Sequence, residues 1–122
     1  MKSIRTITSR VIQCAAPAAV AVLLGLSGSA FAADVDAEAA QALAKKNDCT
    51  KCHAIDKTKK GPALKKIAAK YAGKADGEDK IIKNITTGPK IKLEDGTEEE
   101  HKIIETKDAK ALKNLAQWIL AQ

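Results

Sequence analysis

A run of five residues, Cys49-Thr50-Lys51-Cys52-His53, limits most strongly what this chain can fold into. Two cysteines separated by two residues and followed at once by histidine form the attachment signature of a c-type haem. This spacing lets the two thiols reach the two vinyl groups of one porphyrin edge, and it places the imidazole of His53 where a ring nitrogen can bind the iron. The motif therefore predicts one covalently bound haem c held by Cys49, Cys52 and His53.

Three other interpretations of the two cysteines agree less well with the sequence. A structural zinc site needs four ligands, and the remaining partner of the usual kind is His101. A thioredoxin-like dithiol site requires a βαβ context, whereas the flanking sequence has helical patterns. A disulfide between Cys49 and Cys52 would close so short a loop that it would add little stability. Haem attachment is therefore the interpretation that we favour.

The first 32 residues have the three parts of a secretory signal peptide. A basic start is followed by an apolar run over residues 15–26, and Ala30-Phe31-Ala32 provides small residues at a cleavage point. The run is shorter than the ~20 residues that a membrane-spanning helix needs, so we expect cleavage after Ala32 rather than a retained anchor. The sequence thus predicts export through the Sec pathway to the periplasm, with residues 33–122 as the working domain.

The remaining chain is long enough for one small domain, which buries a modest share of its surface and often needs a covalent or metal staple. Its aromatic residues are Tyr71 and Trp118, so a haem would supply the large apolar body that the core otherwise lacks. Removal of the three basic residues of the signal lowers the formal net charge from +6 to about +3. With no arginine and few aromatics, this domain is not typical of nucleic-acid binding, and its mild positive charge favours docking to an acidic protein.

Four segments have the apolar spacing and the end signals of short helices. Asp36 is expected to cap the first helix, Pro62 to start the second, and Gly88-Pro89 to end the third. The expected helices run over residues 37–46, from Pro62 to a stop at Gly73, over residues 78–87, and from near Thr106 or Asp108 to Ala121.

Residues 90–105 have a different pattern. The run Lys90-Ile91-Lys92-Leu93 alternates charged and apolar residues, and Asp95-Gly96 is a strong tight-turn pair, so the following residues could return as a second strand. A solvated charged loop is the alternative. With a two-residue turn at Asp95-Gly96, His101 would lie on the face of Lys92, opposite the two apolar residues of the run.

The order of these features resembles a class I c-type cytochrome of the small monohaem bacterial kind. A short helix, the CxxCH motif, a Gly-Pro pair after a loop, a middle helix ending Lys70-Tyr71-Ala72-Gly73 and a final helix with Ala116-Gln117-Trp118-Ile119-Leu120 follow one another over nearly all of residues 34–122. The resemblance implies an all-α fold whose first and last helices cross near the haem. It also implies that the Pro62 carbonyl accepts a hydrogen bond from the His53 ring, which makes the imidazole a better donor to iron.

The chain departs from this family at the second axial ligand of the iron. The family usually supplies a methionine there, but the one methionine of the chain is Met1, which leaves with the signal. His101 is the second histidine of the chain and stands where that methionine is expected, so we interpret it as the sixth ligand. The alternatives are a surface histidine beside an open or weakly filled iron position, or a lysine that must first lose its proton, namely Lys90, Lys92 or Lys102.

With both axial positions filled by protein, one-electron exchange is the chemistry left to the iron. We therefore expect a periplasmic electron carrier, not an enzyme, that acts as a monomer, has no membrane span after signal cleavage, and has a lower potential than His/Met relatives. The alternative is a haem protein whose displaceable sixth ligand lets it bind or sense a small molecule. Lysines near the motif are expected to steer an acidic redox partner, namely Lys51, Lys57, Lys59, Lys60, Lys65 and Lys66.

Overall fold

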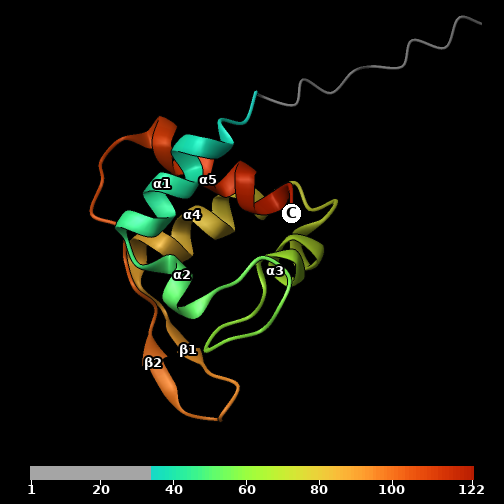
Figure 1. Cartoon of the computed structure of the whole chain (residues 1–122), viewed down its shortest axis with the longest axis vertical. Coiled ribbons are helices and arrows are strands. Elements are labelled where there is room, and N and C mark those ends of the chain that lie inside the picture. Colours follow the sequence, from blue (N-terminus) through green and yellow to red (C-terminus); the bar gives the residue numbers. More distant parts are fainter. Residues whose placement is uncertain (1–33) are drawn as a thin grey trace, which may run out of the picture. The chain divides into compact units, whose positions relative to one another are not determined.

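The computed structural model describes residues 34–122, and the signal peptide expected at residues 1–32 lies outside this part of the chain. Within it, the elements follow in the order α1 (Ala37–Lys46), α2 (Cys49–Cys52), α3 (Leu64–Tyr71), α4 (Gly77–Thr87), β1 (Lys90–Lys92), β2 (Glu98–Glu100) and α5 (Ala109–Leu120) (Figure 1). The expected mainly helical fold is confirmed, and the possible hairpin before the last helix is present. No helix among these residues combines the length and the hydrophobicity that crossing a membrane requires.

Both long terminal helices begin at an aspartate that caps them. The Asp36 carboxylate accepts a hydrogen bond from the Ala39 N–H at 2.9 Å. The Asp108 carboxylate accepts from the N–H groups of Lys110 and Ala111 at 2.9 and 3.2 Å. These bonds satisfy amide groups that have no partner within the first turn of a helix. The expected bounds of α1 are confirmed, and α5 begins directly after its cap.

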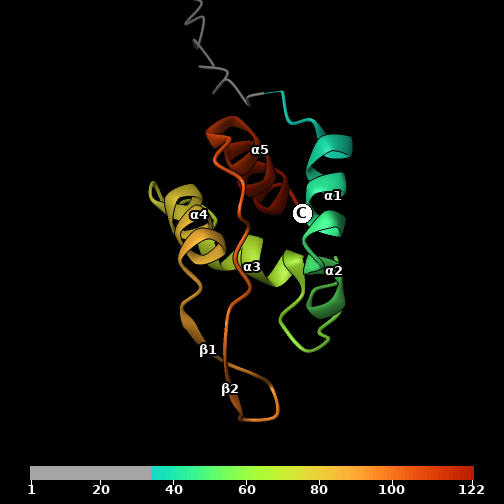
Figure 2. The same cartoon turned by 90° about the vertical axis from the view of Figure 1, so that its left-hand side faces the viewer.

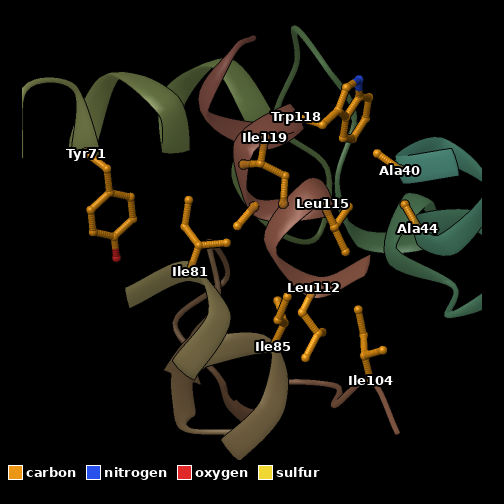
Figure 3. Packing of buried hydrophobic residues seen from close by; sticks show 11 residues of the cluster. Ala40, Ala44, Tyr71, Ile81, Ile85, Ile104, Leu112, Leu115, Trp118 and Ile119 are labelled. Atoms are coloured by element: carbon orange, nitrogen blue, oxygen red, sulfur yellow. The ribbon is translucent and has the colours of Figure 1, made fainter. Parts of the chain in front are cut away.

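α1 and α5 pack against each other through small side chains (Figures 2 and 3). Ala40 and Ala44 of α1 and Ala116 of α5 are buried, and such small side chains let the two helices approach closely. At the start of α1, the Asn114 amide bridges the two helices. Its Oδ1 accepts from the Asp36 N–H at 2.9 Å, and its Nδ2 donates to the Asp36 carbonyl at 2.8 Å. The crossing of first and last helices implied by the family resemblance is therefore present.

The hydrophobic core lies on the inner side of α5. Figure 3 shows Leu115 between the alanines of α1 on one side and Ile81 and Ile85 of α4 on the other. Burial of such apolar surface is the main source of stability in a small domain. The core includes both aromatic residues, and its buried members are Ala40, Ala44, Tyr71, Ile81, Ile85, Ile104, Leu112, Leu115, Ala116, Trp118 and Ile119.

α3 begins at Leu64, two residues later than the start expected at Pro62. The residue before the helix has no side-chain cap. Instead, the carbonyl oxygens of Ala54 and Ile55 accept the N–H groups of Leu64 and Lys65 at 2.8 and 3.0 Å. The loop after the CxxCH motif therefore caps α3, and Pro62 stays outside the helix with its own carbonyl available to another donor.

The hairpin turn contains one residue more than expected. β1 and β2 pair antiparallel with Ile91 opposite Glu99, and the Leu93 N–H donates to the Thr97 carbonyl at 2.8 Å. The turn between them therefore has three residues and ends at Gly96, whose φ of 86° is left-handed. A left-handed glycine is common at the last position of a three-residue hairpin turn. The two-residue turn considered for Asp95-Gly96 is therefore not the one that forms.

This change of register reverses the face on which His101 lies. A shift of one residue moves every side chain of a strand to the opposite face. The His101 N–H donates to the Pro89 carbonyl at 2.9 Å, which continues the pairing beyond β2. His101 therefore shares its face with Ile91 and Leu93, and not with Lys92 as expected. The hairpin extends from the helices at the end where α2 lies (Figures 1 and 2).

Candidate functional site

α2 is a single helical turn that carries both cysteines of the motif. Asp48 precedes it in the left-handed conformation, with φ of 58°, and the chain leaves it at His53, whose N–H donates to the Cys49 carbonyl at 2.9 Å. Residues three apart on such a turn point the same way, as two thiols joined to one porphyrin edge must. Cys49 and Cys52 are both free, in contrast to the disulfide interpretation, and burial raises the pKa of the Cys49 thiol.

The segment Gly61-Pro62 holds the ring of His53. The His53 Nδ1–H donates to the Pro62 carbonyl oxygen at 2.7 Å. Because a carbonyl oxygen can only accept, the proton is on Nδ1 and Nε2 keeps its lone pair. The backbone of Gly61 lies against the same ring, since a Cβ added there would be 2.7 Å from His53 Cε1. The Gly61 N–H donates to the Cys52 carbonyl at 2.8 Å, which fixes this loop to the motif.

The ring of His101 is held in a similar way from the hairpin. Its Nδ1–H donates to the Lys102 carbonyl at 2.8 Å, so its Nε2 also keeps a free lone pair. Because Gly88 has no side chain, its backbone can lie close to that of His101. A Cβ on Gly88 would lie 2.8 Å from the His101 carbonyl oxygen, and its φ of 60° is left-handed. Gly88-Pro89 therefore positions His101 much as the earlier Gly-Pro pair positions the first histidine.

The two imidazole rings line the same cavity, with centroids 6.2 Å apart and planes inclined by 37°. Two imidazoles bound to opposite sides of one metal ion at about 2 Å per bond would have centroids roughly 6 Å apart, because each centroid lies about 1 Å behind its nitrogen. The spacing of His53 and His101 therefore fits an axial pair. Within residues 34–122, no three or more His, Cys, Asp or Glu side chains are grouped as a zinc site would require.

The cavity has a volume of about 620 Å³ and opens between the CxxCH turn, the helices α1, α3, α4 and α5, and the hairpin. This volume is in the range of pockets that enclose a cofactor-sized ligand, and apolar walls are usual in such pockets. Its volume and its apolar wall therefore fit a large apolar macrocycle attached at Cys49, which is one of the lining residues. The apolar side chains of its wall are Ala44, Leu64, Ile67, Tyr71, Ile81, Ile85, Ile91, Leu93, Leu115, Trp118 and Ile119.

The electrostatic environment favours His101 over a lysine as a metal ligand. Burial lowers the pKa of His101; the hydrogen bond to the Lys102 carbonyl opposes this effect, and the proximity of the His53 imidazole adds to it. The imidazole is therefore neutral at physiological pH, as a ligand must be. Lys102 has the opposite tendency, because its hydrogen bond to Asp48 raises the pKa of its ammonium group. Lys92 reaches the cavity wall but is an exposed residue.

The lysines predicted to steer a partner are all exposed, but three of them make specific contacts. Lys51 Nζ lies 3.1 Å from Asp48 Oδ1. Lys60 Nζ lies 2.7 Å from a carboxylate oxygen of Glu99 in β2. Lys59 Nζ donates to the Thr50 carbonyl at 2.6 Å. From the sequence, Gly61 and Gly88 had no assigned role in holding the histidine rings, and Glu99 had no specific partner. The two glycines were visible beside prolines, whereas no sequence signal pointed to the contact of Glu99.

Known proteins show the same family features. The family model described as Cytochrome c matches residues 37–121. Cytochrome c-552 of Nitrosomonas europaea is 40% identical over 95 residues, which cover 69% of this chain and 79% of that protein. Cytochrome c-551 of Pseudomonas aeruginosa is 40% identical over 62 residues, 51% of this chain. The chain spans 60% of the length of that relative, which is less than two thirds.

A solved structure agrees with the fold as well as with the sequence. The class 1 cytochrome MtoD from Sideroxydans lithotrophicus ES-1 is 55% identical to this chain, with a TM-score of 0.69. The superposed region covers 71% of this chain and 96% of MtoD. The expected family is confirmed by these matches. The chain belongs to the cytochrome c family, as a class I monohaem c-type cytochrome with one covalently bound haem c.

Proposed function

We propose that this protein carries single electrons between redox partners in the periplasm, with His53 and His101 as the two axial ligands of its haem iron. The observation that carries the proposal is the placement of the two imidazoles, 6.2 Å apart on one cavity. When bound, the haem supplies a one-electron couple between ferric and ferrous iron. Two protein ligands leave no iron position for a substrate, which favours a carrier over an enzyme.

The chain's contribution is to orient and strengthen two nitrogen donors. Each Nδ1–H is donated to a backbone carbonyl, one at Pro62 and one at Lys102. Such a bond fixes the tautomer and the ring orientation, and it raises the basicity of the other ring nitrogen. Methionine ligation raises haem potential, so we propose that this imidazole pair gives a lower potential than His/Met relatives have.

We propose that the protein is a monomer and that acidic redox partners dock on the surface beside the attachment turn. Ile55, 45% exposed, is one of the two large apolar side chains most exposed within residues 34–122. The exposed lysines Lys57 and Lys59 follow it within four residues, after Asp56. A small apolar contact with a positive rim suits fast, weak and salt-sensitive association.

The ferric holoprotein is expected to keep a low-spin absorption spectrum from alkaline pH down to below pH ~6.5, the ordinary pKa of histidine. Protonation removes an imidazole ligand, and burial lowers the pKa of His101, so ligand loss shifts to more acidic pH. A pH titration followed by absorption checks this result. A lysine ligand would behave differently, because it would take up a proton and leave the iron as the pH falls through the alkaline range. A spectral change confined to that alkaline range would contradict ligation by His101.

Export is tested separately from ligation. We expect protein recovered from the periplasmic fraction to begin at Ala33 and to have the mass of residues 33–122 plus one haem. The new N-terminus follows from the expected cleavage site after Ala32. The haem mass follows because, in this proposal, the chain is exported first and haem is attached on the outer side of the membrane. Intact-mass spectrometry measures both features at once. The Cys49→Ser/Cys52→Ser variant is the control, which should be exported and cleaved but lack the haem mass. A haem-containing chain that keeps residues 1–32 would contradict cleavage.

A further inference from the structure

Two ion pairs join the hairpin to the loops that flank the attachment motif, and we refer to them as the hairpin ion pairs. Lys60 Nζ lies 2.7 Å from Glu99 Oε1, and Lys102 Nζ lies 2.8 Å from Asp48 Oδ2. On the hairpin side, the two partners stand two positions before and one position after His101. On the other side, one partner directly precedes the Gly-Pro pair that holds the first histidine, and the other directly precedes the first cysteine.

The other polar contacts of residues 94–102 stay within the hairpin and its immediate neighbours. The strands pair with each other, the Asp95 carboxylate accepts two hydrogen bonds from Thr97, and His101 bonds to residues next to it along the strands. Within the described chain, the hairpin ion pairs are thus the polar contacts that tie this segment to the rest of the domain. Movement of the hairpin away from the cavity would break them and leave its internal bonds intact.

We propose that the hairpin ion pairs position His101 at the iron and set how often its imidazole leaves. This inference rests on the proposed role of His101 as the sixth ligand. The four side chains are between 40% and 61% exposed, so each pair changes the equilibrium between closed and open hairpin by a factor of about two to five. Salt screens exposed pairs of this kind. Loss of an ion pair changes the local opening of the hairpin rather than global unfolding, because the helices keep their contacts with one another when the hairpin moves.

The test measures how fast cyanide replaces His101 on the ferric holoprotein. At saturating cyanide, the rate seen in the absorption spectrum is limited by the departure of His101. At low ionic strength, we expect Lys60→Gln and Glu99→Gln each to raise this limiting rate about two- to fivefold. The double variant should be no faster than either single variant, because both remove the same pair. The exchanged pair, Lys60→Glu with Glu99→Lys, should return the rate toward that of the wild type.

Lys80→Gln is the matched control. It breaks the ion pair between Lys80 and Asp76, which has the same 2.7 Å separation and similar exposure but lies on α4. We expect it to leave the limiting cyanide rate unchanged at low salt. Added salt should speed the wild type and have little effect on the Lys60→Gln/Lys102→Gln variant, which lacks both hairpin ion pairs. A rise in rate with Lys80→Gln equal to that with Lys60→Gln would overturn the specific role of the hairpin ion pairs.

His101→Ala separates a failure of this inference from a failure of the ligand assignment. If His101 binds the iron, its removal abolishes the limiting rate, and cyanide binds in proportion to its concentration. If its removal leaves the kinetics unchanged, the ligand assignment fails, and this inference fails with it. If His101→Ala behaves as expected while Lys60→Gln and Glu99→Gln match the wild type at low salt, the ion pairs do not position His101 and this inference alone is overturned.

Discussion

Replacement of His101 by alanine is expected to convert the ferric haem from a low-spin to a high-spin spectrum at neutral pH. On the cavity face of the hairpin, the neighbours of His101 are the apolar residues Ile91 and Leu93, so this face has no second neutral nitrogen that could bind the iron. Carbon monoxide should also bind the reduced variant roughly 10- to 1,000-fold faster, since a minor open state of the wild type is populated at about 0.1–10%. Absorption spectroscopy and rapid mixing with carbon monoxide measure the two effects.

Two further variants control this experiment. Lys92→Ala removes a lysine that also lines the cavity, and it should leave the low-spin spectrum unchanged. His101→Met offers a thioether from the same position, so it should restore low-spin iron and raise the potential above that of the wild type. A low-spin spectrum that survives in His101→Ala would show that another group occupies the sixth position.

Gly61→Ala is expected to lower both the stability of the holoprotein and the order of its haem site. The added methyl group would lie 2.7 Å from His53 Cε1, closer than real Cβ contacts allow. The loop cannot retreat freely, because the Gly61 N–H is bonded to the Cys52 carbonyl at 2.8 Å. Overpacking of this kind costs about 1–3 kcal/mol, which corresponds to a fall of roughly 4–20 °C in Tm for a domain of this size. Thermal unfolding and the ferric spectrum provide the two measurements.

Gly96→Ala is the matched control for Gly61→Ala. It adds the same methyl group at the hairpin turn, where nothing lies within 4 Å but the φ of 86° disfavours a side chain. Backbone strain should cost about 1–2 kcal/mol without changing the ferric spectrum. If Gly61→Ala altered Tm alone, as Gly96→Ala is expected to do, the contact between Gly61 and the ring of His53 would have no role in ligation.

Much of the helical fold could be predicted because its signals are local. Asp36 and Asp108 cap their helices by accepting hydrogen bonds from amides two or three residues further along the chain. The residues that determine where α1 and α5 begin are therefore neighbours in the sequence. The start of α3 is different. Its first amide groups bind the carbonyl oxygens of Ala54 and Ile55, a contact that exists only after the preceding loop has folded. Local rules therefore placed this helix two residues too early.

The register of the hairpin could not be predicted for a related reason. An Asp-Gly pair serves both two-residue and three-residue turns. The choice here accompanies burial of Leu93, the residue after β1, and the bond from the His101 N–H to the Pro89 carbonyl. Both contacts involve residues outside the turn. A single added residue in the turn moves His101 to the other face of the hairpin. The position of this proposed ligand therefore depended on the turn length, which the sequence does not determine.

The attachment motif could be identified from the sequence because its residues are contiguous. Apart from the bond between His53 and the Pro62 carbonyl, which the family resemblance implies, the surroundings of the two histidines could not be identified in the same way. The contact of Gly61 with the ring of His53 forms only when the loop after the motif folds back on itself, and the ion pair between Lys60 and Glu99 joins segments that are distant along the chain. Neither contact follows a spacing rule, since both depend on the path of the loop and on the reach of the hairpin.

The Nδ1 atoms of His53 and His101 are hydrogen-bonded to main-chain carbonyl oxygens, at Pro62 and at Lys102 respectively. An amide oxygen has no proton to gain or lose over the range in which proteins work, unlike the carboxylates that hold many other metal-binding histidines. The polarisation of both rings is therefore the same in acid and in alkaline surroundings. An electron carrier supported in this way would keep its two imidazoles equally strong donors as the pH of its surroundings changes.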